Sequence, residues 1–178
     1  MKRLLIQIFA IITITNAYSF AANAGSVKTS ADAQTHVEIV DALIRFTNGM
    51  DTDNGDLIAS AFTEQGVADF TPAAKKVGMQ FPVLTGKQTI VSALVPFAAN
   101  YTTSHSVTNT RAEVNGDVAN LYALVEANHL PLNDNNSYYM MKNQYWMSLK
   151  KEDGVWRISQ MTIENLWSQG QLSVMTGK

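Results

Sequence analysis

The sequence has 178 residues, a formal net charge of −2 and no cysteine. A chain without cysteine cannot use a thiol nucleophile or a cysteine zinc site, so its chemistry must come from His, carboxylates, Tyr or Arg. The slightly acidic balance offers nothing to attract a polyanion, and we expect no nucleic-acid partner.

The first 24 residues have the features of a secretory signal peptide. Lys2 and Arg3 precede an apolar run, and Ala22-Asn23-Ala24 has the small-residue pattern of a cleavage site. The run is too short for a membrane span, and no later segment approaches the roughly 18 apolar residues that a span needs. We therefore expect cleavage after Ala24 and an exported mature protein, periplasmic or secreted, without a membrane anchor.

The rest of the chain is long enough for one domain with a substantial core. We predict a signal peptide over residues 1–24, a flexible segment over 25–34, one domain over 35–170 and a C-terminal tail over 171–178.

The first half of the domain shows helical patterns. Apolar residues recur at Val37, Val40 and Ile44, which predicts a helix of about four turns with Ser30 or Thr35 as its N-cap. After the polar "DTDNGD", the segment "LIASAF" predicts a second, short helix and "VADF" a short strand. We expect a loop over the polar "TPAAKKVGM" and a third helix over the amphipathic "KQTIVSALVPFAAN".

The second half consists of long alternating runs that predict four antiparallel strands in a meander. They are "TTSHSVTNTRAEV", "DVANLYALVEANHL", "YYMMKNQYWMSLKK" and "VWRISQMTIENLW", and the tight-turn signals "NGD" and "EDG" separate two of the pairs. Helices followed by a sheet indicate an α+β fold class.

One face of these strands carries residues suited to a pocket. His105, Val107 and Asn109 share a face of the first strand, and His129 ends a row of small apolar residues on the second. On the third strand, one side carries aromatic, Met and polar groups that form a pocket wall: Tyr139, Met141, Asn143, Tyr145 and Met147. We expect Asn109, Tyr139, Asn143 and Tyr145 to bind a ligand.

The order of elements and several phrases resemble the SnoaL-like branch of the nuclear transport factor 2-like superfamily. The phrases are "FTNGMDTDNGDLIASAFTEQG", "LTGKQTIVSAL", "TTSHSVTNTRAEVNGDVANLYALVEANHL" and "DGVWRI". The resemblance implies a cone: a curved antiparallel sheet wrapped by three N-terminal helices, with an apolar pocket between them. It also suggests a homodimer formed through the sheet.

The resemblance extends to dehydratase members of the scytalone dehydratase and bile-acid dehydratase types. In these an Asp after the first helix holds a strand His that acts as general acid and base, and the matching residues here are Asp51 and His105. His129 matches a second strand His of scytalone dehydratase. Phe46 stands where bile-acid dehydratases use a Tyr, which places their substrate in doubt for this chain.

Each candidate also has a structural explanation. His105 could line a pocket without reacting, Asp51 could be a turn residue, and His129 could be a rim residue beside Leu130-Pro131. Scattered histidines without close spacing do not indicate a metal site, and no glycine-rich phosphate loop or serine elbow is present.

Together these features predict an exported pocket protein that binds a small hydrophobic molecule. The leading hypothesis is a lyase or isomerase that needs no cofactor and uses Asp51, His105 and His129 as its catalytic residues. The alternative is a non-catalytic module that binds a small apolar ligand or dimerises through the sheet. Contact between Asp51 and His105 in an open cavity favours the enzyme, whereas a filled interior favours the module.

Overall fold

A computed structural model describes residues 31–134 and 136–176; the predicted signal peptide, residues 1–24, and its cleavage site lie outside the described residues. The elements, in chain order, are α1 (Ala33–Asp51), α2 (Gly55–Ala61), β1 (Phe62–Asp69), α3 (Thr71–Lys76), β2 (Leu84–Thr85), α4 (Lys87–Ala98), β3 (Tyr101–Asn115), β4 (Val118–Pro131), β5 (Tyr139–Glu152), β6 (Val155–Gly170) and α5 (Ser173–Thr176). Among the described residues no helix is both long and apolar enough to cross a membrane.

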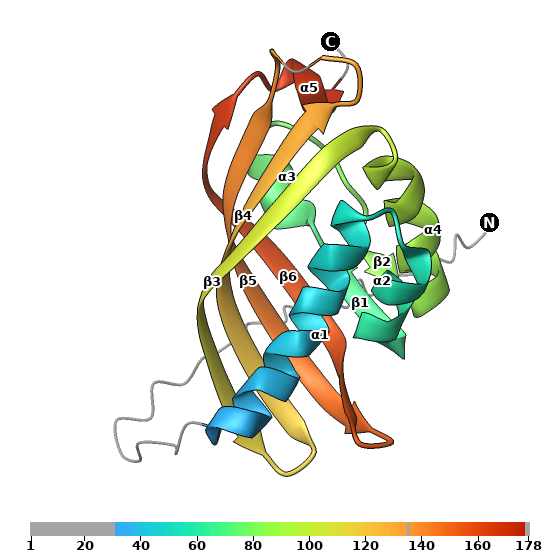
Figure 1. Cartoon of the computed structure of the whole chain (residues 1–178), viewed down its shortest axis with the longest axis vertical. Helices are drawn as coiled ribbons and strands as arrows, with labels where there is room; N and C mark the ends of the chain where they lie inside the picture. Colours follow the sequence, from blue (N-terminus) through green and yellow to red (C-terminus); the bar gives the residue numbers. More distant parts are fainter. Residues whose placement is uncertain (1–30, 135, 177–178) are drawn as a thin grey trace, which may run out of the picture.

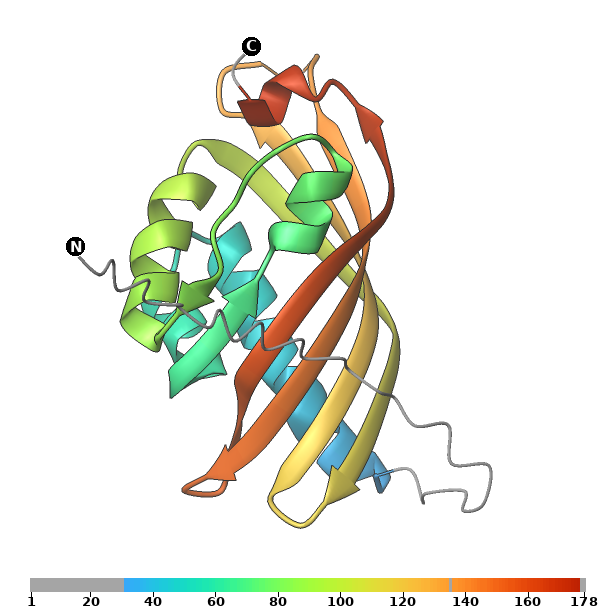
Figure 2. The ribbon, with the colours of Figure 1, turned by 180° about the vertical axis from the view of Figure 1, so that it is seen from behind.

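The predicted meander is confirmed: β3, β4, β5 and β6 pair in sequence as antiparallel neighbours. The described strands form one six-stranded sheet in the order β2-β1-β6-β5-β4-β3, in which β1 runs parallel to β6. Figures 1 and 2 show that the long strands twist and curve around the helices, which lie on one side of the sheet. The α+β class and the cone-shaped architecture are therefore as predicted.

The inward face of the sheet follows the period-2 alternation of the sequence. Every second side chain of β4 from Ala119 to His129 is buried, and on β5 the inward residues from Asn143 to Leu149 are buried in the same way. Tight turns join the strands where residues adopt left-handed backbone conformations, at Gly116 and at Asp153-Gly154. The alternation thus sends one row of each strand toward the helices.

Helix α1 lies across the curved face of the sheet and ends beside β3 (Figure 1). Its N-cap is Asp32, whose carboxylate accepts a hydrogen bond from the Thr35 backbone N–H, so the expectation of Ser30 or Thr35 as the cap is wrong. Phe46 packs edge to face on Phe62 at the start of β1. This packing holds the C-terminal half of α1, which ends at Asp51, against β1.

Gly49 allows the close approach of α1 and α2 that shapes the turn after Asp51. A Cβ at this position would lie 2.6 Å from Cγ1 and 2.8 Å from the backbone nitrogen of Ile58. Any larger residue would therefore push α2 away and move the end of α1, on which the Asp51 carboxylate depends.

One prediction about the elements is corrected by the structure, and two short elements were not predicted. The segment "TPAAKKVGM" contains helix α3 instead of a loop, with Pro72 in its first turn, where a missing N–H costs nothing. The short strand predicted at "VADF" is confirmed within β1, and β2 is a further short strand that was not predicted. The C-terminal segment includes the short helix α5, and the backbone oxygen of Val174 accepts a hydrogen bond from the Tyr101 hydroxyl.

Candidate functional site

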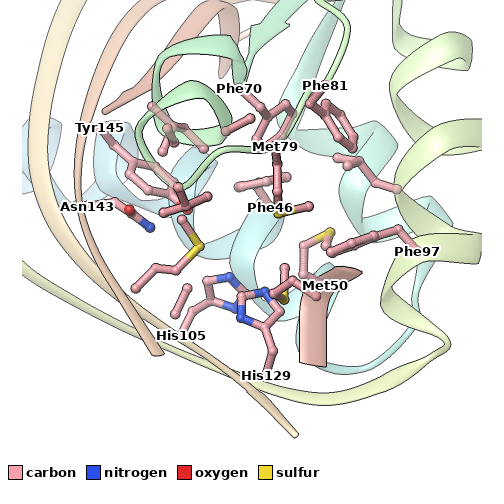
Figure 3. Close-up of a pocket in the computed structure, with 18 residues that line it drawn as sticks. Phe46, Met50, Phe70, Met79, Phe81, Phe97, His105, His129, Asn143 and Tyr145 are labelled. Atoms are coloured by element: carbon pink, nitrogen blue, oxygen red, sulfur yellow. The ribbon is translucent and has the colours of Figure 1, made fainter. Parts of the chain in front are cut away.

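A cavity of about 110 Å³ lies between the sheet and helices α1, α3 and α4. Its wall is mainly apolar, and includes Phe46, Met50, Phe70, Met79, Phe81 and Phe97 (Figure 3). Four polar residues interrupt this wall: His105, His129, Asn143 and Tyr145. An apolar cavity with a few convergent polar groups is the usual form of a small-molecule site.

Asp51 and His105 are in direct contact at the edge of this cavity. Asp51 Oδ1 lies 2.5 Å from His105 Nδ1, although 54 positions separate the two residues in the chain. The His105 side chain is only 5% exposed and lines the cavity, whereas the Asp51 side chain is 21% exposed. The expected contact between Asp51 and His105 is thus present in the structure, beside the cavity.

The Asp51 carboxylate is held by three donors of β3. Oδ2 accepts the backbone N–H of His105 at 2.9 Å, and Oδ1 accepts the Thr103 hydroxyl at 2.9 Å in addition to the imidazole. Burial alone would raise the pKa of Asp51, but the hydrogen bonds and charge of the His105 ring, with the other two donors, outweigh burial and lower it. Asp51 is therefore a fixed carboxylate anion.

This arrangement selects one tautomer of the His105 ring. The carboxylate can only accept, so Nδ1 of the neutral ring carries the proton and Nε2 holds the lone pair. A neutral imidazole in this tautomer can take a proton at Nε2, and the carboxylate stabilises the cation that results. The pair has the chemistry of an oriented general base.

His129 lies beside His105, with ring centroids 6.5 Å apart (Figure 3). Its Nδ1 is 3.3 Å from the backbone oxygen of Tyr139, an acceptor, so Nδ1 is the protonated nitrogen and Nε2 is the acceptor. Burial, assisted by the positive charge that His105 can carry, lowers the pKa of His129 from 6.5 to about 4. His129 is therefore neutral at neutral pH and suited to accept a hydrogen bond.

Asn143 and Tyr145 bring polar groups to the cavity from β5. Burial, and to a lesser extent the negative charge of Asp51, raises the pKa of Tyr145 well above its ordinary value. Its hydroxyl therefore stays protonated and can donate a hydrogen bond.

The structure places two of the predicted ligand-binding residues away from the cavity. Asn109 is exposed at a bulge of β3 with φ of 53°, so the strand alternation that would place it beside His105 is broken before it. The Tyr139 hydroxyl instead donates to Ser168 Oγ at 2.9 Å. The expectation that Asn109 and Tyr139 line this cavity is therefore wrong.

Two residues of the site, Thr103 and Met175, were not predicted from the sequence. Thr103 lies two positions before His105 on the same strand face, and this spacing could have indicated its contact with Asp51. Met175 lines the cavity from the C-terminal segment, for which the sequence carries no signal. The described residues contain no cluster of three or more His, Asp or Glu side chains that could hold a metal ion.

A curved α+β cone with an apolar cavity between its sheet and helices is the architecture of the nuclear transport factor 2-like superfamily. The family described as SnoaL-like domain matches residues 31–162, about three quarters of the sequence. The chain belongs to this SnoaL-like family. No curated protein sequence matches it significantly.

Solved structures with the same fold are similar over most of this chain. A provisionally designated scytalone dehydratase from Novosphingobium aromaticivorans shares 17% identity and a TM-score of 0.65, covering 78% of this chain and 89% of its own. The hexachlorocyclohexane dehydrochlorinase LinA-type3 from Novosphingobium barchaimii has 17% sequence identity and a TM-score of 0.62. The match covers 78% of this chain and 91% of that chain. A single-site variant of Rv3472 from Mycobacterium tuberculosis, a protein of unknown function, has 23% sequence identity and a TM-score of 0.63. The match covers 74% of this chain and 72% of that chain. At these identities the similarity establishes the fold alone.

Proposed function

We propose that this SnoaL-like protein is a lyase or isomerase that needs no cofactor and removes a proton next to a carbonyl or hydroxyl of a small hydrophobic molecule. The observation that carries the proposal is the 2.5 Å contact between Asp51 and His105 beside an apolar cavity. In this scheme His105 Nε2 takes the proton from carbon, and Asp51 stabilises the imidazolium. In a lyase the imidazolium then gives the proton to the departing hydroxyl, which leaves as water; in an isomerase it returns the proton to another atom of the substrate.

The roles of the two histidines differ. His129 is neutral and presents a lone pair, so it accepts a hydrogen bond from the substrate while His105 exchanges the proton. The names of two similar structures, a dehydratase and a dehydrochlorinase, both denote eliminations. An elimination removes a proton and a leaving group, which is consistent with one oriented base in a largely apolar cavity.

The size of the cavity favours a ligand of about one ring. Its volume of about 110 Å³ is small beside the roughly 300–1,000 Å³ of sites for drug-sized molecules. Single-ring aromatic compounds are therefore better first probes than polycyclic ones.

A panel of single-ring aromatic compounds should raise the melting temperature of the protein. A ligand at about 100 times its dissociation constant adds roughly 2.7 kcal/mol to the free energy of unfolding. Ala127→Leu should abolish this shift, because Ala127 lines the cavity and a larger side chain fills it. Differential scanning calorimetry with and without each compound measures the effect.

The matched control is Asn128→Leu, an apolar substitution on the opposite face of the same strand. It should leave the ligand-induced shift in place. If no compound stabilises the wild type, or if Ala127→Leu keeps the full shift, ligand binding in this cavity is refuted and the non-catalytic interaction module becomes the better hypothesis.

We also propose that the protein acts after export, on the basis of the charged start, apolar run and Ala22-Asn23-Ala24 of the sequence. Expressed with its own N-terminus in a bacterial host, the protein recovered from the periplasm or medium should begin at Gly25. N-terminal sequencing and intact mass measure this directly. A cytoplasmic product that retains Met1 to Ala24 would refute export without affecting the proposed chemistry.

A further inference from the structure

We propose that Asn165, which does not line the cavity, is a positioning residue that fixes the Asn143 amide with its NH2 group toward the cavity, so that the site selects a small apolar ketone. The inference rests on the proposed ligand-binding function and names the substrate class of that site. It follows from the hydrogen bonds of two buried Asn side chains on β5 and β6.

The orientation of Asn165 is fixed by backbone carbonyl groups. Its Nδ2 lies 3.0 Å from the backbone oxygen of Trp167 and 3.4 Å from that of Lys142. Because a carbonyl oxygen only accepts, the nitrogen of the Asn165 amide must face these two atoms, and the opposite orientation would oppose oxygen to oxygen. The polarity of this side chain therefore follows from the backbone around it.

The orientation of the Asn165 amide determines the orientation of the Asn143 amide. Of the two N–H groups of Asn165 Nδ2, one donates to the Trp167 oxygen and the other to Asn143 Oδ1 at 2.9 Å, while the more distant Lys142 oxygen at 3.4 Å shares one of them. The two Asn side chains are 5% and 3% exposed. With its oxygen turned to Asn165, Asn143 is left with two N–H donors, and Figure 3 shows its nitrogen on the cavity side. Among the described residues, none accepts a hydrogen bond from the NH2 group of Asn143.

The β-bulge in β6 makes this contact possible. The register shifts between Lys142 and Asn143, so that Asn143 pairs with Asn165 while Lys142 pairs with Trp167. The bulge brings the two amides directly opposite each other and turns the Trp167 carbonyl toward Asn165.

Tyr145 supplies a second donor next to Asn143. The two residues are two positions apart on β5, share its inward face and both line the cavity. Tyr145 is 3% exposed, and its hydroxyl has no hydrogen-bond partner among the described residues. Trp156 Nε1 is the one fully enclosed side-chain polar atom without a partner in the described part of the chain, so the Asn143 and Tyr145 donors are not enclosed but reach the cavity, where a ligand acceptor can bind them.

The cavity thus has two kinds of polar wall. His105 and His129 each present an Nε2 lone pair, whereas Asn143 and Tyr145 present N–H and O–H donors. A carbonyl oxygen matches the donor wall, and the remaining wall is apolar. A small ketone with an apolar body fits this distribution better than a hydrocarbon of the same shape.

Acetophenone and α-methylstyrene test this inference, because they have the same shape and differ by a C=O in place of a C=CH2 group. Isothermal titration gives the ratio of their dissociation constants for each variant. Loss of one hydrogen bond should reduce the preference for acetophenone roughly three- to tenfold in Asn165→Ala, relative to the wild type. Gln144→Leu, which removes an amide from the outer face of the same strand, should leave the ratio unchanged.

Asn143→Leu gives the same test if Asn165→Ala does not fold. In the folded wild type, acetophenone should also shift the side-chain N–H signals of Asn143 in a ¹H–¹⁵N spectrum, and α-methylstyrene should not. If both probes bind but the ratio is the same in wild type, Asn165→Ala and Asn143→Leu, the inference is wrong while the proposed cavity stands. If neither probe binds the wild type, the inference and the proposed ligand site both fail.

Discussion

Replacing Asp51 by Asn or His105 by Ala is expected to reduce turnover by roughly 10² to 10⁴, the usual contribution of a positioned general base. The substrate for this assay is to be sought among the compounds that stabilise the protein. His105→Ala removes the nitrogen that takes the proton, whereas Asp51→Asn leaves the imidazole in place. Steady-state kinetics of both variants, with circular dichroism to confirm folding, measures the effect.

Asp51→Asn should act by reversing the tautomer of His105. In the wild type the His105 backbone N–H donates to Asp51 Oδ2. In Asp51→Asn only the amide oxygen of the new side chain can accept this hydrogen bond. The amide NH2 group then takes the place of Oδ1 and donates to the ring at Nδ1. The proton of the neutral ring moves to Nε2, and that nitrogen can no longer accept a proton from the substrate.

Asp53→Asn is the matched control, because it removes a nearby carboxylate from the turn that follows α1. Asp53 has φ of 51°, a conformation that Asn also adopts readily. We expect this variant to retain full activity. Equal losses in Asp53→Asn and Asp51→Asn would show that net charge, and not the contact with His105, supports turnover.

The second large effect is a loss of stability in acid that originates at His129. Its pKa falls from 6.5 to about 4 on folding, so the unfolded chain binds more protons between these pH values. The contribution of this group to stability is complete above about pH 6.5 and is lost as the pH falls toward 4. A difference of this size corresponds to about 3 kcal/mol in the free energy of unfolding.

Urea denaturation of wild type and His129→Asn across this pH range measures the contribution. The Asn side chain keeps an N–H donor for the Tyr139 carbonyl but does not titrate. The variant should therefore lose about 3 kcal/mol less than the wild type between neutral pH and pH 4. Asp51, whose pKa is lowered below 3.8, acts at lower pH and does not obscure this window. Parallel pH profiles would contradict a buried, neutral His129.

The sheet was predictable because period-2 alternation and tight-turn residues are local features of the sequence. Helix α3 was not predictable in this way, because a six-residue helix shows no apolar repeat. Helix α3 is stabilised by packing instead: Ala73 and Ala74 are buried against the rest of the fold, and such tertiary contacts leave no local pattern in the sequence. The cap of α1 was misplaced by a short distance, since Ser, Thr and Asp are all suitable caps and several occur near the helix start.

The pair of Asp51 and His105 was identified from a resemblance to dehydratases, and its geometry required the structure. Asn109 was misplaced because a bulge after Thr108 interrupts the alternation on which its assignment relied. Asn165 is on the inward face of β6, so alternation could have flagged it as a buried polar residue. Its partner could not be predicted, because the register of β5 and β6 shifts at the same position.

The ring tautomer of His105 tests the central claim most directly, because it requires no substrate. In ¹⁵N-labelled wild-type protein at alkaline pH, a long-range ¹H–¹⁵N spectrum should show Nδ1 protonated and Nε2 unprotonated, with the His105 signals assigned by their absence in His105→Ala. Asp51→Asn should reverse this pattern and protonate Nε2. A wild-type ring protonated at Nε2, with the same spectrum in Asp51→Asn, would contradict the claim that Asp51 orients His105 as a base.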